Sequence, residues 1–268
     1  MKNNRLSVSL VITTYNRVDA LTAVLNSILK QSVFPDEVII ADDGSTVSTQ
    51  ELIEKLSADF PVPLLHCWQE DTGFRVSAIR NKAMSKATSD YIVMIDGDIV
   101  LHKHFIRDHM RIASRGKFIQ GRRVLLSEEF TNQILSEQDM HITAWSKGVK
   151  NRLNAVSSRA LSPMFSTIFS KQKSTSIRGC NMAFWKSDVI AVNGFNEEFE
   201  GWGREDSEFV VRLFNSGIRR KDLRFGGVGY HLHHPENSKK MLEQNELLLE
   251  KTISQQLKYC SLGIDQYL

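Results

Sequence analysis

Apolar and polar positions form short blocks along the first hundred residues, and these blocks predict a regular succession of strands and helices. Unbroken apolar runs are typical of buried strands, whereas apolar residues spaced three and four apart are typical of helices. We predict strands at 6–14, 37–41, 64–68 and 90–95, and helices at 18–31, 48–56 and 77–86. Strands that alternate with helices in this way indicate an α/β protein with a parallel sheet.

The second half of the chain is less regular. It predicts helices at 104–113, 187–191 and 238–259, and strands at 118–125, 181–185 and 228–232. Residues 127–176 are rich in Ser, Gln, Asn and Lys, and we expect helices there or an insertion that orders on binding, such as a lid. Spaced apolar side chains at 152–169 favour a lid or a packed helix pair over a membrane-surface segment. Pro163 interrupts any single helix across them.

Composition narrows the class of protein rather than its activity. The 268 residues are 41% hydrophobic and 24% charged, and a net charge of +3 is too small to indicate a nucleic-acid partner. The three cysteines lack the spacing of a zinc site or a disulfide framework, so a reducing cytosol is expected. Because no apolar run approaches the roughly 18 residues that span a bilayer, and no signal peptide is recognisable, we expect a soluble or at most peripheral chain.

The strand predicted at 90–95 ends in Asp96-Gly97-Asp98, the most informative stretch of the chain. In an open α/β sheet, such a strand brings both carboxylates to the edge where these folds bind ligands. Two carboxylates so close repel each other unless a cation or a shared proton lies between them. Hard oxygen ligands suit Mg²⁺ or Mn²⁺, which then bridge to substrate phosphates. A solvated turn is the alternative for an isolated Asp-x-Asp.

Four further pieces occur in order before this one, at 11–17, 40–45, 70–75 and 80–81. As a set, the five resemble the nucleotide-binding half of a family 2 glycosyltransferase of the GT-A fold. The resemblance implies an α/β fold whose nucleotide-binding, Rossmann-like mixed sheet is flanked by helices, with a smaller acceptor-binding C-terminal part. It also implies one domain with a nucleotide-sugar-binding half at 1–100 and an acceptor-binding and catalytic half at 101–268, the latter including the lid or insertion.

Nucleotide-sugar binding is expected of residues around these strand ends. Tyr15 or a neighbour could cover the uracil, and Asp42 could accept hydrogen bonds from the base or ribose while also forming a turn with the following residues. Arg80 could face the cleft from its helix or hold the fold by an ion pair. The complete expected set is Thr13, Tyr15, Asn16, Asp42, Asp43, Gly73, Arg75, Arg80 and Asp96.

A second specific motif is Gly201-Trp202-Gly203-Arg204-Glu205-Asp206. It resembles the carboxy-terminal module of β-1,4-galactosyltransferases, bacterial chondroitin polymerases and polypeptide N-acetylgalactosaminyltransferases. Trp202 offers an apolar face to a sugar ring, and Gly203 lets the backbone approach it closely. In the inverting members, the aspartate that matches Asp206 takes the acceptor hydroxyl's proton. The resemblance therefore implies Asp206 as base and Glu205 as its hydroxyl-binding neighbour; the alternative is that both merely stabilise the start of a helix.

Two other segments complete the expected site. In the late predicted strand, alternation would point His231 and His233 to one face and His234 to the other. Related enzymes place a metal-binding histidine after this strand, which His231 matches best, while His233 competes with it and is otherwise a substrate contact. The expected metal ligands are Asp98, Asp96 and His231, a set that suits Mn²⁺ better than Mg²⁺.

Arg178-Gly179-Cys180-Asn181 resembles the segment that lines the acceptor side in these enzymes. Arg178, Gly179 and Asn181 are therefore expected substrate contacts. Asn181 could hydrogen-bond a sugar hydroxyl, and Gly179 permits close approach. The alternative is a turn that enters a core strand.

The resemblance implies a metal-dependent, inverting glycosyltransferase that moves a hexose or N-acetylhexosamine from a UDP-sugar to an oligosaccharide or lipid-linked glycan, in lipopolysaccharide or capsule synthesis. Such an enzyme is expected in the cytoplasm or peripherally at the inner face of the cell membrane. The alternatives are a retaining transferase of the same fold and a non-catalytic nucleotide-sugar-binding protein. Residues 94–100 also resemble the nucleophile strand of haloacid-dehalogenase-type phosphatases, but that class leaves the motif at 201–206 unexplained.

Overall fold

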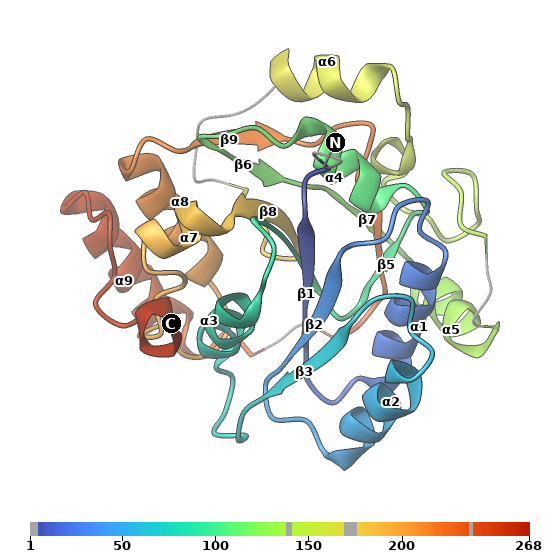
Figure 1. Cartoon of the computed structure of the whole chain (residues 1–268), viewed down its shortest axis with the longest axis horizontal. Coiled ribbons are helices and arrows are strands. Elements are labelled where there is room, and N and C mark those ends of the chain that lie inside the picture. The colour runs from blue at the N-terminus through green and yellow to red at the C-terminus, as the bar shows by residue number, and fades with distance from the viewer. Residues whose placement is uncertain (1–4, 138–140, 169–175, 236–237) are drawn as a thin grey trace.

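Within residues 5–137, 141–168, 176–235 and 238–268, which the computed structural model describes, the protein is built around a mixed seven-stranded sheet (Figure 1). Its strands, in spatial order, are β3 (Leu64–Trp68), β2 (Glu37–Asp42), β1 (Val8–Thr14), β4 (Tyr91–Asp96), β8 (Asn181–Trp185), β6 (Lys117–Gln120) and β9 (Arg219–Asp222). The first four are parallel, and β8 is antiparallel to both of its neighbours. The α/β class and the mixed sheet are therefore confirmed.

A second sheet of three short strands lies beside the first, in the order β5 (Ile99–Leu101), β10 (Gly229–His231) and β7 (Arg123–Leu125). The single strand predicted at 118–125 was wrong, because the segment divides into β6 and β7 of different sheets. The division falls at Gly121, whose N–H bonds the carbonyl of Asn181 at 2.8 Å. A Cβ there would lie 2.2 Å from the Asn181 side chain, so only glycine fits where the two segments cross.

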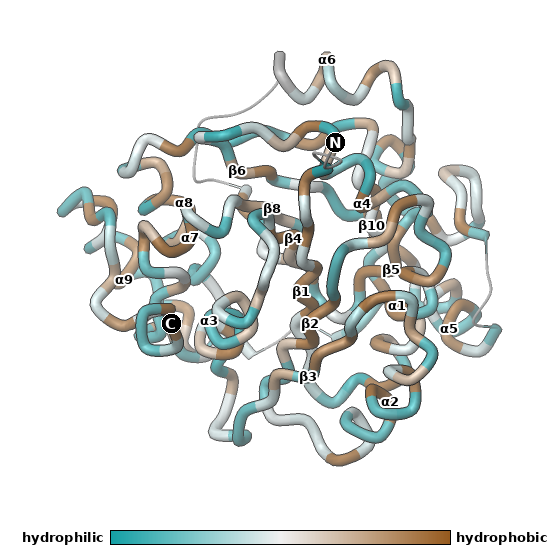
Figure 2. Tube along the Cα trace, viewed as in Figure 1, coloured by the Kyte–Doolittle hydropathy of each residue, from teal (hydrophilic) through white to brown (hydrophobic). Residues whose placement is uncertain are grey.

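Helices cover both faces of the large sheet, as the side-chain alternation along β1 requires. Leu10 and Ile12 pack in one buried cluster with α1 (Val18–Leu29), α2 (Val47–Ser57) and α4 (Phe105–Ile112). Val11 points the other way, into a cluster with α3 (Val76–Lys86), α7 (Lys186–Ala191) and α8 (Glu205–Asn215). Figure 2 shows the resulting apolar centre along β1 and β4. No helix among the described residues is long and apolar enough to cross a membrane.

The segment at 127–176 contains helices, as one of the two predictions for it stated. They are α5 (Glu128–Glu137), the short 3₁₀ helix η1 (Arg152–Ala155) and α6 (Leu161–Ile168). Pro163 is the third residue of α6, where a missing N–H costs no helical hydrogen bond. Residues 138–140 and 169–175 lie outside the described residues, including Phe169 at the end of the predicted lid or helix pair.

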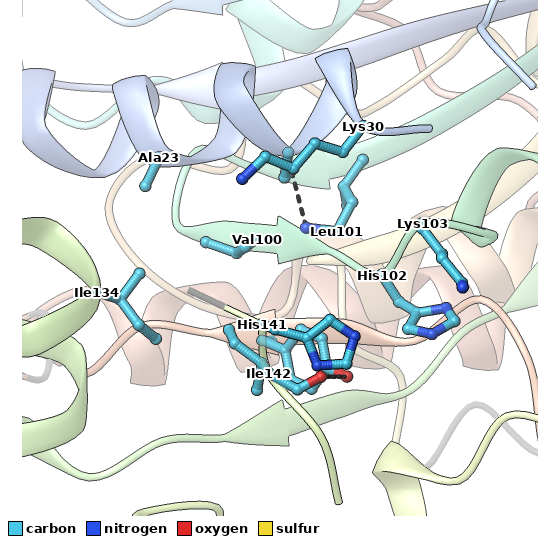
Figure 3. A pocket seen from close by; sticks show the side chains of 11 residues that line it. Ala23, Lys30, Val100, Leu101, His102, Lys103, Ile134, His141 and Ile142 are labelled. Carbon is cyan, nitrogen blue, oxygen red and sulfur yellow. Dashed lines mark hydrogen bonds between the residues drawn. The ribbon is translucent and has the colours of Figure 1, made fainter. Parts of the chain in front are cut away.

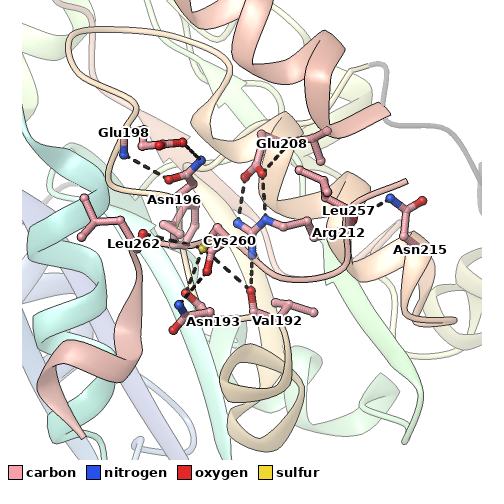
Figure 4. A network of polar contacts seen from close by, with 12 residues as sticks. Val192, Asn193, Asn196, Glu198, Glu208, Arg212, Asn215, Leu257, Cys260 and Leu262 are labelled. Carbon is pink, nitrogen blue, oxygen red and sulfur yellow. Dashed lines mark hydrogen bonds and ion pairs between the residues drawn. The ribbon is translucent and has the colours of Figure 1, made fainter. Parts of the chain in front are cut away.

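A buried ion pair and its hydrogen bonds hold α8 against α9, the last α-helix (Figure 4). Both Arg212 and Glu208 are essentially inaccessible, and Nη2 of Arg212 lies 2.8 Å from Oε2 of Glu208. Arg212 also donates to the carbonyl of Val192, and the hydroxyl of Thr252 donates to Glu208 at 3.0 Å. Thr252 belongs to α9 (Leu242–Ser254), which ends five residues earlier than predicted. These contacts fix α8, whose first residues carry the expected catalytic carboxylates.

Candidate active site

The Asp-Gly-Asp segment turns tightly at the end of β4. The N–H of Gly97 bonds the carbonyl of Thr13 at 2.7 Å, which ties the turn to the end of β1. A Cβ on Gly97 would lie 2.9 Å from that same carbonyl oxygen, so a side chain has no room. The turn presents two partly accessible carboxylates, with Asp96 35% and Asp98 15% exposed. The strand-end position predicted for both is thus observed.

Two histidines, His231 and His234, lie against Asp98. The antiparallel register of β10 and β5 sets His231 opposite Ile99, next to the aspartate. Nε2 of His231 lies 3.7 Å and Nε2 of His234 3.1 Å from Oδ2 of Asp98. One ligand atom from each of the three residues falls within 4.8 Å of the others, as a metal site requires.

The alternation predicted for the histidines was wrong. β10 ends at His231, so the two-residue period of a strand does not reach His233 and His234. His233 has an exposed side chain and donates its backbone N–H to the hydroxyl of Thr131 at 2.8 Å. His234 turns back toward Asp98 instead. Sequence reasoning missed His234 because the chain bends irregularly before Pro235, and the only signal was the density of histidines there.

Burial and the neighbouring charges act in opposite directions on the pKa values of this cluster. Burial acts to raise the pKa of Asp98, but the His234 hydrogen bond and both histidine charges together lower it. Burial lowers the pKa of His231 to about 4, so its imidazole is neutral at physiological pH, as a metal ligand must be. Oδ1 of Asp98 is buried and has no hydrogen-bond partner among the described residues. An orphaned carboxylate oxygen beside a neutral imidazole fits a divalent cation.

Arg80 joins the two motifs that the sequence analysis treated separately. The side chain is 4% exposed and extends from α3 to contact Asp96 at 3.1 Å and Glu205 at 3.2 Å. Its Nε also donates to the hydroxyl of Thr13 at 3.3 Å. The ion pair that was one of the two predictions for Arg80 is observed, and it lies between the two groups of expected site carboxylates.

The carboxylates around Arg80 are hard to ionise. Burial, and then the charge of Asp206, raises the pKa of Glu205 to about 7 despite the nearby guanidinium. Burial and the charge of Asp98 also raise the pKa of Asp96, while Arg80 opposes both. A carboxyl that holds its proton near neutral pH can donate a hydrogen bond as well as accept one.

Asp206 sits in the first turn of α8, which begins at Glu205 as predicted. Arg204 before it adopts a left-handed conformation with φ of 75°, which turns the chain sharply into the helix. One oxygen of Asp206 accepts the N–H of Gly179 at 2.8 Å, and the other accepts the hydroxyl of Ser207 at 3.1 Å. Gly179 also lies close to Arg80, with a Cβ position 3.2 Å from its Nη2. The expected acceptor segment thus adjoins the expected base.

The other two expected substrate contacts in the segment 178–181, Arg178 and Asn181, differ in their exposure. Arg178 is exposed, whereas Asn181 is 1% exposed and points into the protein. The amide of Asn181 donates to the carbonyls of Arg122 and Gly227, at 2.9 and 3.1 Å. The structure therefore does not bring Asn181 to the surface of the site, and its contacts fit the alternative of a turn that enters a core strand.

Asp42 ends β2 and is completely buried. Its Oδ1 accepts the N–H of Ser45 at 2.8 Å, which is the turn foreseen from the sequence, and its Oδ2 lies 2.9 Å from Nε2 of His66. Asp43 accepts the N–H of Arg75 at 2.9 Å, and burial raises its pKa. Both aspartates therefore shape the loops at this sheet edge, and a nucleotide contact from Asp42 would require exchange of one of these bonds.

Tyr15 and Asn16 leave the end of β1 at the same edge. Tyr15 is 48% exposed and its hydroxyl donates to Asp71 at 2.8 Å. Asn16 has a φ of 47° and accepts the N–H of Thr46. Gly73, with a φ of 98°, lies in the exposed loop that begins at Asp71. An accessible aromatic ring of this kind can stack against another flat ring.

The loop at 71–75, expected to bind the donor, contacts the loop at 201–203, expected to bind the acceptor. The N–H of Gly201 bonds the carbonyl of Phe74 at 3.0 Å, and Gly201 has a φ of 68°. Trp202 follows with 39% of its side chain exposed, and the carbonyl of Gly203 accepts the amide of Asn245 at 2.9 Å. The residues expected to hold the donor and the sugar ring are therefore neighbours in space.

A separate cavity of about 110 Å³ lies between α1, β5 and the residues around Ile134 (Figure 3). Apolar side chains such as Val100 and Ile134 line it together with Lys30, His102 and Lys103. It contains none of the residues that the sequence analysis selected, and it is not the site described above.

The sheet order and the carboxylates at the ends of β4 and at the start of α8 define a GT-A glycosyltransferase fold. S. aureus TarS 1–349 in complex with UDP-GlcNAc superposes with a TM-score of 0.64 at 17% identity, covering 98% of this chain and 69% of that one. The mannosyltransferase PcManGT from Pyrobaculum calidifontis in complex with GDP-Man and Mn²⁺ gives 0.59 at 17% identity, covering 86% and 58%. At such identities the likeness concerns the fold alone.

The chain belongs to glycosyl transferase family 2, whose family model matches residues 9–190. A model described as the N-terminal domain of galactosyltransferase matches residues 159–235. The chondroitin synthase of Pasteurella multocida is 26% identical over 87% of this chain and 25% of its own length. That of Escherichia coli is 27% identical over 85% and 35%. The chain thus spans a quarter to a third of these relatives, and both resemblances stated from the sequence are confirmed.

Proposed function

We propose that the protein is a metal-dependent, inverting glycosyltransferase that moves a hexose or N-acetylhexosamine from a UDP-sugar to a glycan acceptor. The observation that carries the proposal is the contact of Arg80 with both Asp96 and Glu205. Through this one side chain, the carboxylates expected to hold the donor lie in the same site as those expected to act on the acceptor. A non-catalytic binding protein has no need of this arrangement.

The donor is bound at the end of the parallel strands. Asp98 and His231, with Asp96 and His234 close by, would hold Mn²⁺ or Mg²⁺. When bound there, the ion would supply positive charge that stabilises the leaving nucleotide. Tyr15, Asn16, Asp42 and the 71–75 loop form the base and ribose pocket. TarS bound to UDP-GlcNAc supports a UDP-sugar, and PcManGT bound to GDP-Man and Mn²⁺ supports the metal.

The acceptor lies over the start of α8. Asp206 takes the proton from its hydroxyl as the oxygen attacks the anomeric carbon, on the face opposite the leaving diphosphate. The N–H of Gly179 orients the carboxylate for this role. Glu205, whose pKa is raised to about 7, donates a hydrogen bond to a sugar hydroxyl, and Trp202 packs against the ring.

We infer the biological setting from the relatives. Chondroitin synthases among them favour synthesis of a surface polysaccharide such as lipopolysaccharide or capsule, on an oligosaccharide or lipid-linked acceptor. We place the enzyme in the cytoplasm, with peripheral contact at the inner face of the membrane. Residues 1–100 form the donor half and residues 101–268 the acceptor half of one domain.

Donor hydrolysis by the purified protein tests the reaction class. UDP-, GDP- and TDP-sugars are compared with Mn²⁺, with Mg²⁺ and with chelator, and nucleotide release is measured. We expect metal-dependent release of UDP from one sugar, and the anomeric configuration of a transferred product, read by NMR, distinguishes inversion from retention. If neither release nor metal-dependent UDP binding is found, the proposal is refuted.

The variant Asp206→Asn tests the catalytic role. It keeps the size and most hydrogen bonds of the side chain but removes the base, so transfer should fall by at least about a hundredfold. Metal-dependent UDP binding, measured by calorimetry, should stay close to that of the wild type. Asp59→Asn, at an exposed position after α2, is the matched control. Transfer retained by D206N would move the base to another residue.

A further inference from the structure

The short helix α6 has an inverted distribution of polar and apolar side chains. Ser162 and Ser166, four residues apart on one side of the helix, are 4% and 0% exposed, and the hydroxyl of Ser166 accepts the N–H of Arg224 at 3.1 Å. Leu161 and Met164, three residues apart on the other side, are 40% and 50% exposed. A surface helix normally buries its apolar side chains and turns polar ones to water. The outer face of α6, which lies at the margin of the molecule in Figure 1, is therefore suited to an apolar partner.

The stretch that leads to α6 exposes further large apolar side chains. Trp145 and Leu153 are each 81% exposed, and no other large apolar side chain among the described residues exceeds 63%. Val156 adds a third, at 37%. Apolar side chains that are exposed singly need no explanation, but residues 145–164 gather five of them. One of these, the indole of Trp145, is of the kind that sits at membrane–water interfaces.

Residues 141–168 carry basic charge without any acidic residue. They contain Lys147, Lys150, Arg152 and Arg159, whereas the rest of the chain holds thirty of the 34 Lys/Arg and all 31 Asp/Glu. All four of these cations are exposed. A chain that is nearly neutral elsewhere thus gathers its excess positive charge in one stretch, where it alternates with the exposed apolar residues. This combination favours an anionic surface with an apolar interior.

Hydrogen bonds hold this stretch against the fold. Nδ2 of Asn151 donates to the carbonyl of Arg123 at 3.0 Å, and its Oδ1 accepts the N–H of Leu125 at 2.7 Å. The N–H of Ser158 donates to the carbonyl of Phe225 at 2.9 Å. Arg123 and Leu125 belong to β7, which pairs with β10, the strand that ends in an expected metal ligand. The exposed residues are therefore attached to the small sheet beside the proposed active site.

We propose that residues 145–164 form a docking surface for an anionic lipid membrane. Trp145, Leu153 and the outer face of α6 enter the headgroup region, while the four cations contact lipid phosphates. The surface thereby holds the enzyme where a lipid-linked acceptor is found. This inference rests on the peripheral membrane contact included in the proposed function, and it adds the surface and the lipid charge. The sequence pattern at 152–169 favoured a lid or a helix pair, whereas the outward position of Leu161 and Met164 favours the membrane surface.

Vesicle binding by the 268-residue chain tests the proposal. Flotation compares vesicles of equal parts phosphatidylglycerol and phosphatidylcholine with vesicles of phosphatidylcholine alone, in about 0.1 M and about 1 M salt. We expect binding to the anionic vesicles to be at least about tenfold tighter in low salt. Most of this preference should be lost in high salt, where the Debye length falls to about 3 Å. Brominated lipids should quench the tryptophan fluorescence of the wild type, and Trp145→Phe should lose most of this quenching.

Two pairs of variants locate the surface. Arg152→Gln removes a charge and should weaken binding to anionic vesicles about fivefold, which corresponds to about 1 kcal/mol. Leu153→Ser removes an apolar contact and should weaken this binding about tenfold. Lys258→Gln and Leu247→Ser make the same changes at exposed positions after and within α9, and they should leave the affinity unchanged. Because all four positions are exposed, the fold should survive each change, and melting temperatures monitor this.

The possible failures are distinguishable. Equal binding to anionic and neutral vesicles, no binding to either, or equal effects of the test and control variants would each overturn the assignment of the surface. Binding to an acidic polysaccharide such as heparin, without binding to vesicles, would also overturn it and indicate a different partner. Metal-dependent UDP binding, measured by calorimetry, should be the same in all four variants as in the wild type. Its absence from the wild type would instead refute the proposed function, and the vesicle result would stand on its own.

Discussion

Replacing Arg80 with methionine removes the link between the two halves of the site. Loss of one partner from a buried ion pair costs about 3 to 5 kcal/mol, because the remaining charge stays buried. The side chain of Asp96 is 35% exposed and Glu205 can take up a proton, so both are partly relieved. We therefore expect R80M to lower the free energy of unfolding by about 3 kcal/mol, the lower end of that range.

A double-mutant cycle with Glu205→Gln isolates the contact and its dependence on pH. The pKa of Glu205 is raised from 4.5 to about 7 in the folded protein, chiefly by burial and then by Asp206. A raised carboxyl pKa means that the folded state holds the proton more tightly, so stability is lost as pH rises from about 4.5 to about 7. We expect the free energy of unfolding of E205Q to depend less on pH over this range. The coupling between Arg80 and Glu205 should be about 1 kcal/mol at pH 5.5 and about 2 kcal/mol at pH 8.5, where the carboxylate is charged.

Urea denaturation of the wild type, both single variants and the double variant at the two pH values measures these couplings. Arg204 and Glu246 supply a control cycle, because this pair lies 2.5 Å apart but both side chains are about 40% exposed. Its coupling should be below about 1 kcal/mol at both pH values. A coupling between Arg80 and Glu205 that is zero, or equal at pH 5.5 and 8.5, would refute the proposed buried link.

Two further predictions concern the proposed metal ligands and the loop at Gly201. Asp98→Ala should weaken Mn²⁺-dependent UDP binding, measured by calorimetry, by more than about tenfold. His234→Ala should weaken this binding more than His233→Ala, because of these two histidines His234 is the one that contacts Asp98. An unchanged metal requirement would place the ligands elsewhere. Gly201→Ala should cost about 2 to 3 kcal/mol in urea denaturation, because its φ is 68° and a Cβ would lie 2.6 Å from Met241. Gly116→Ala, with a φ of 71° and open space around it, should cost about 1 kcal/mol, and equal losses would contradict the packing argument.

The strands of the core could be predicted because burial dictates their composition. The strand at Asn181–Trp185 has the predicted bounds, and β4 differs from its prediction by one residue at each end. By contrast, the basic run Arg219-Arg220-Lys221 is typical of a solvated cluster, yet it belongs to β9 at the edge of the large sheet. Edge strands often carry charges that discourage pairing with other chains, so they lack the apolar run on which sequence prediction depends.

The site was predictable as a set of motifs but not as a geometry. Asp96, Asp98, Glu205 and Asp206 stand out from their spacing and flanking glycines. That Arg80 contacts residues 16 and 125 positions away depends on how α3 packs, which no local pattern encodes. The choice of His234 over His233 depends on where β10 ends, and strand ends are set by tertiary pairing.

Because residues 1–100 share their core with the rest of the chain, they should not fold alone. The residues from Tyr91 to Ile95 are fully buried, and this strand pairs with β8 over five positions. Asn81 of α3 also exchanges hydrogen bonds with the backbone of Phe195, at 2.7 and 2.8 Å. The fragment would expose an apolar strand edge and lose these partners. We expect no cooperative urea transition for the fragment and one for the full chain, measured by circular dichroism. A cooperative transition in the fragment would show that the halves are separate domains, and Arg80 would then join two folding units.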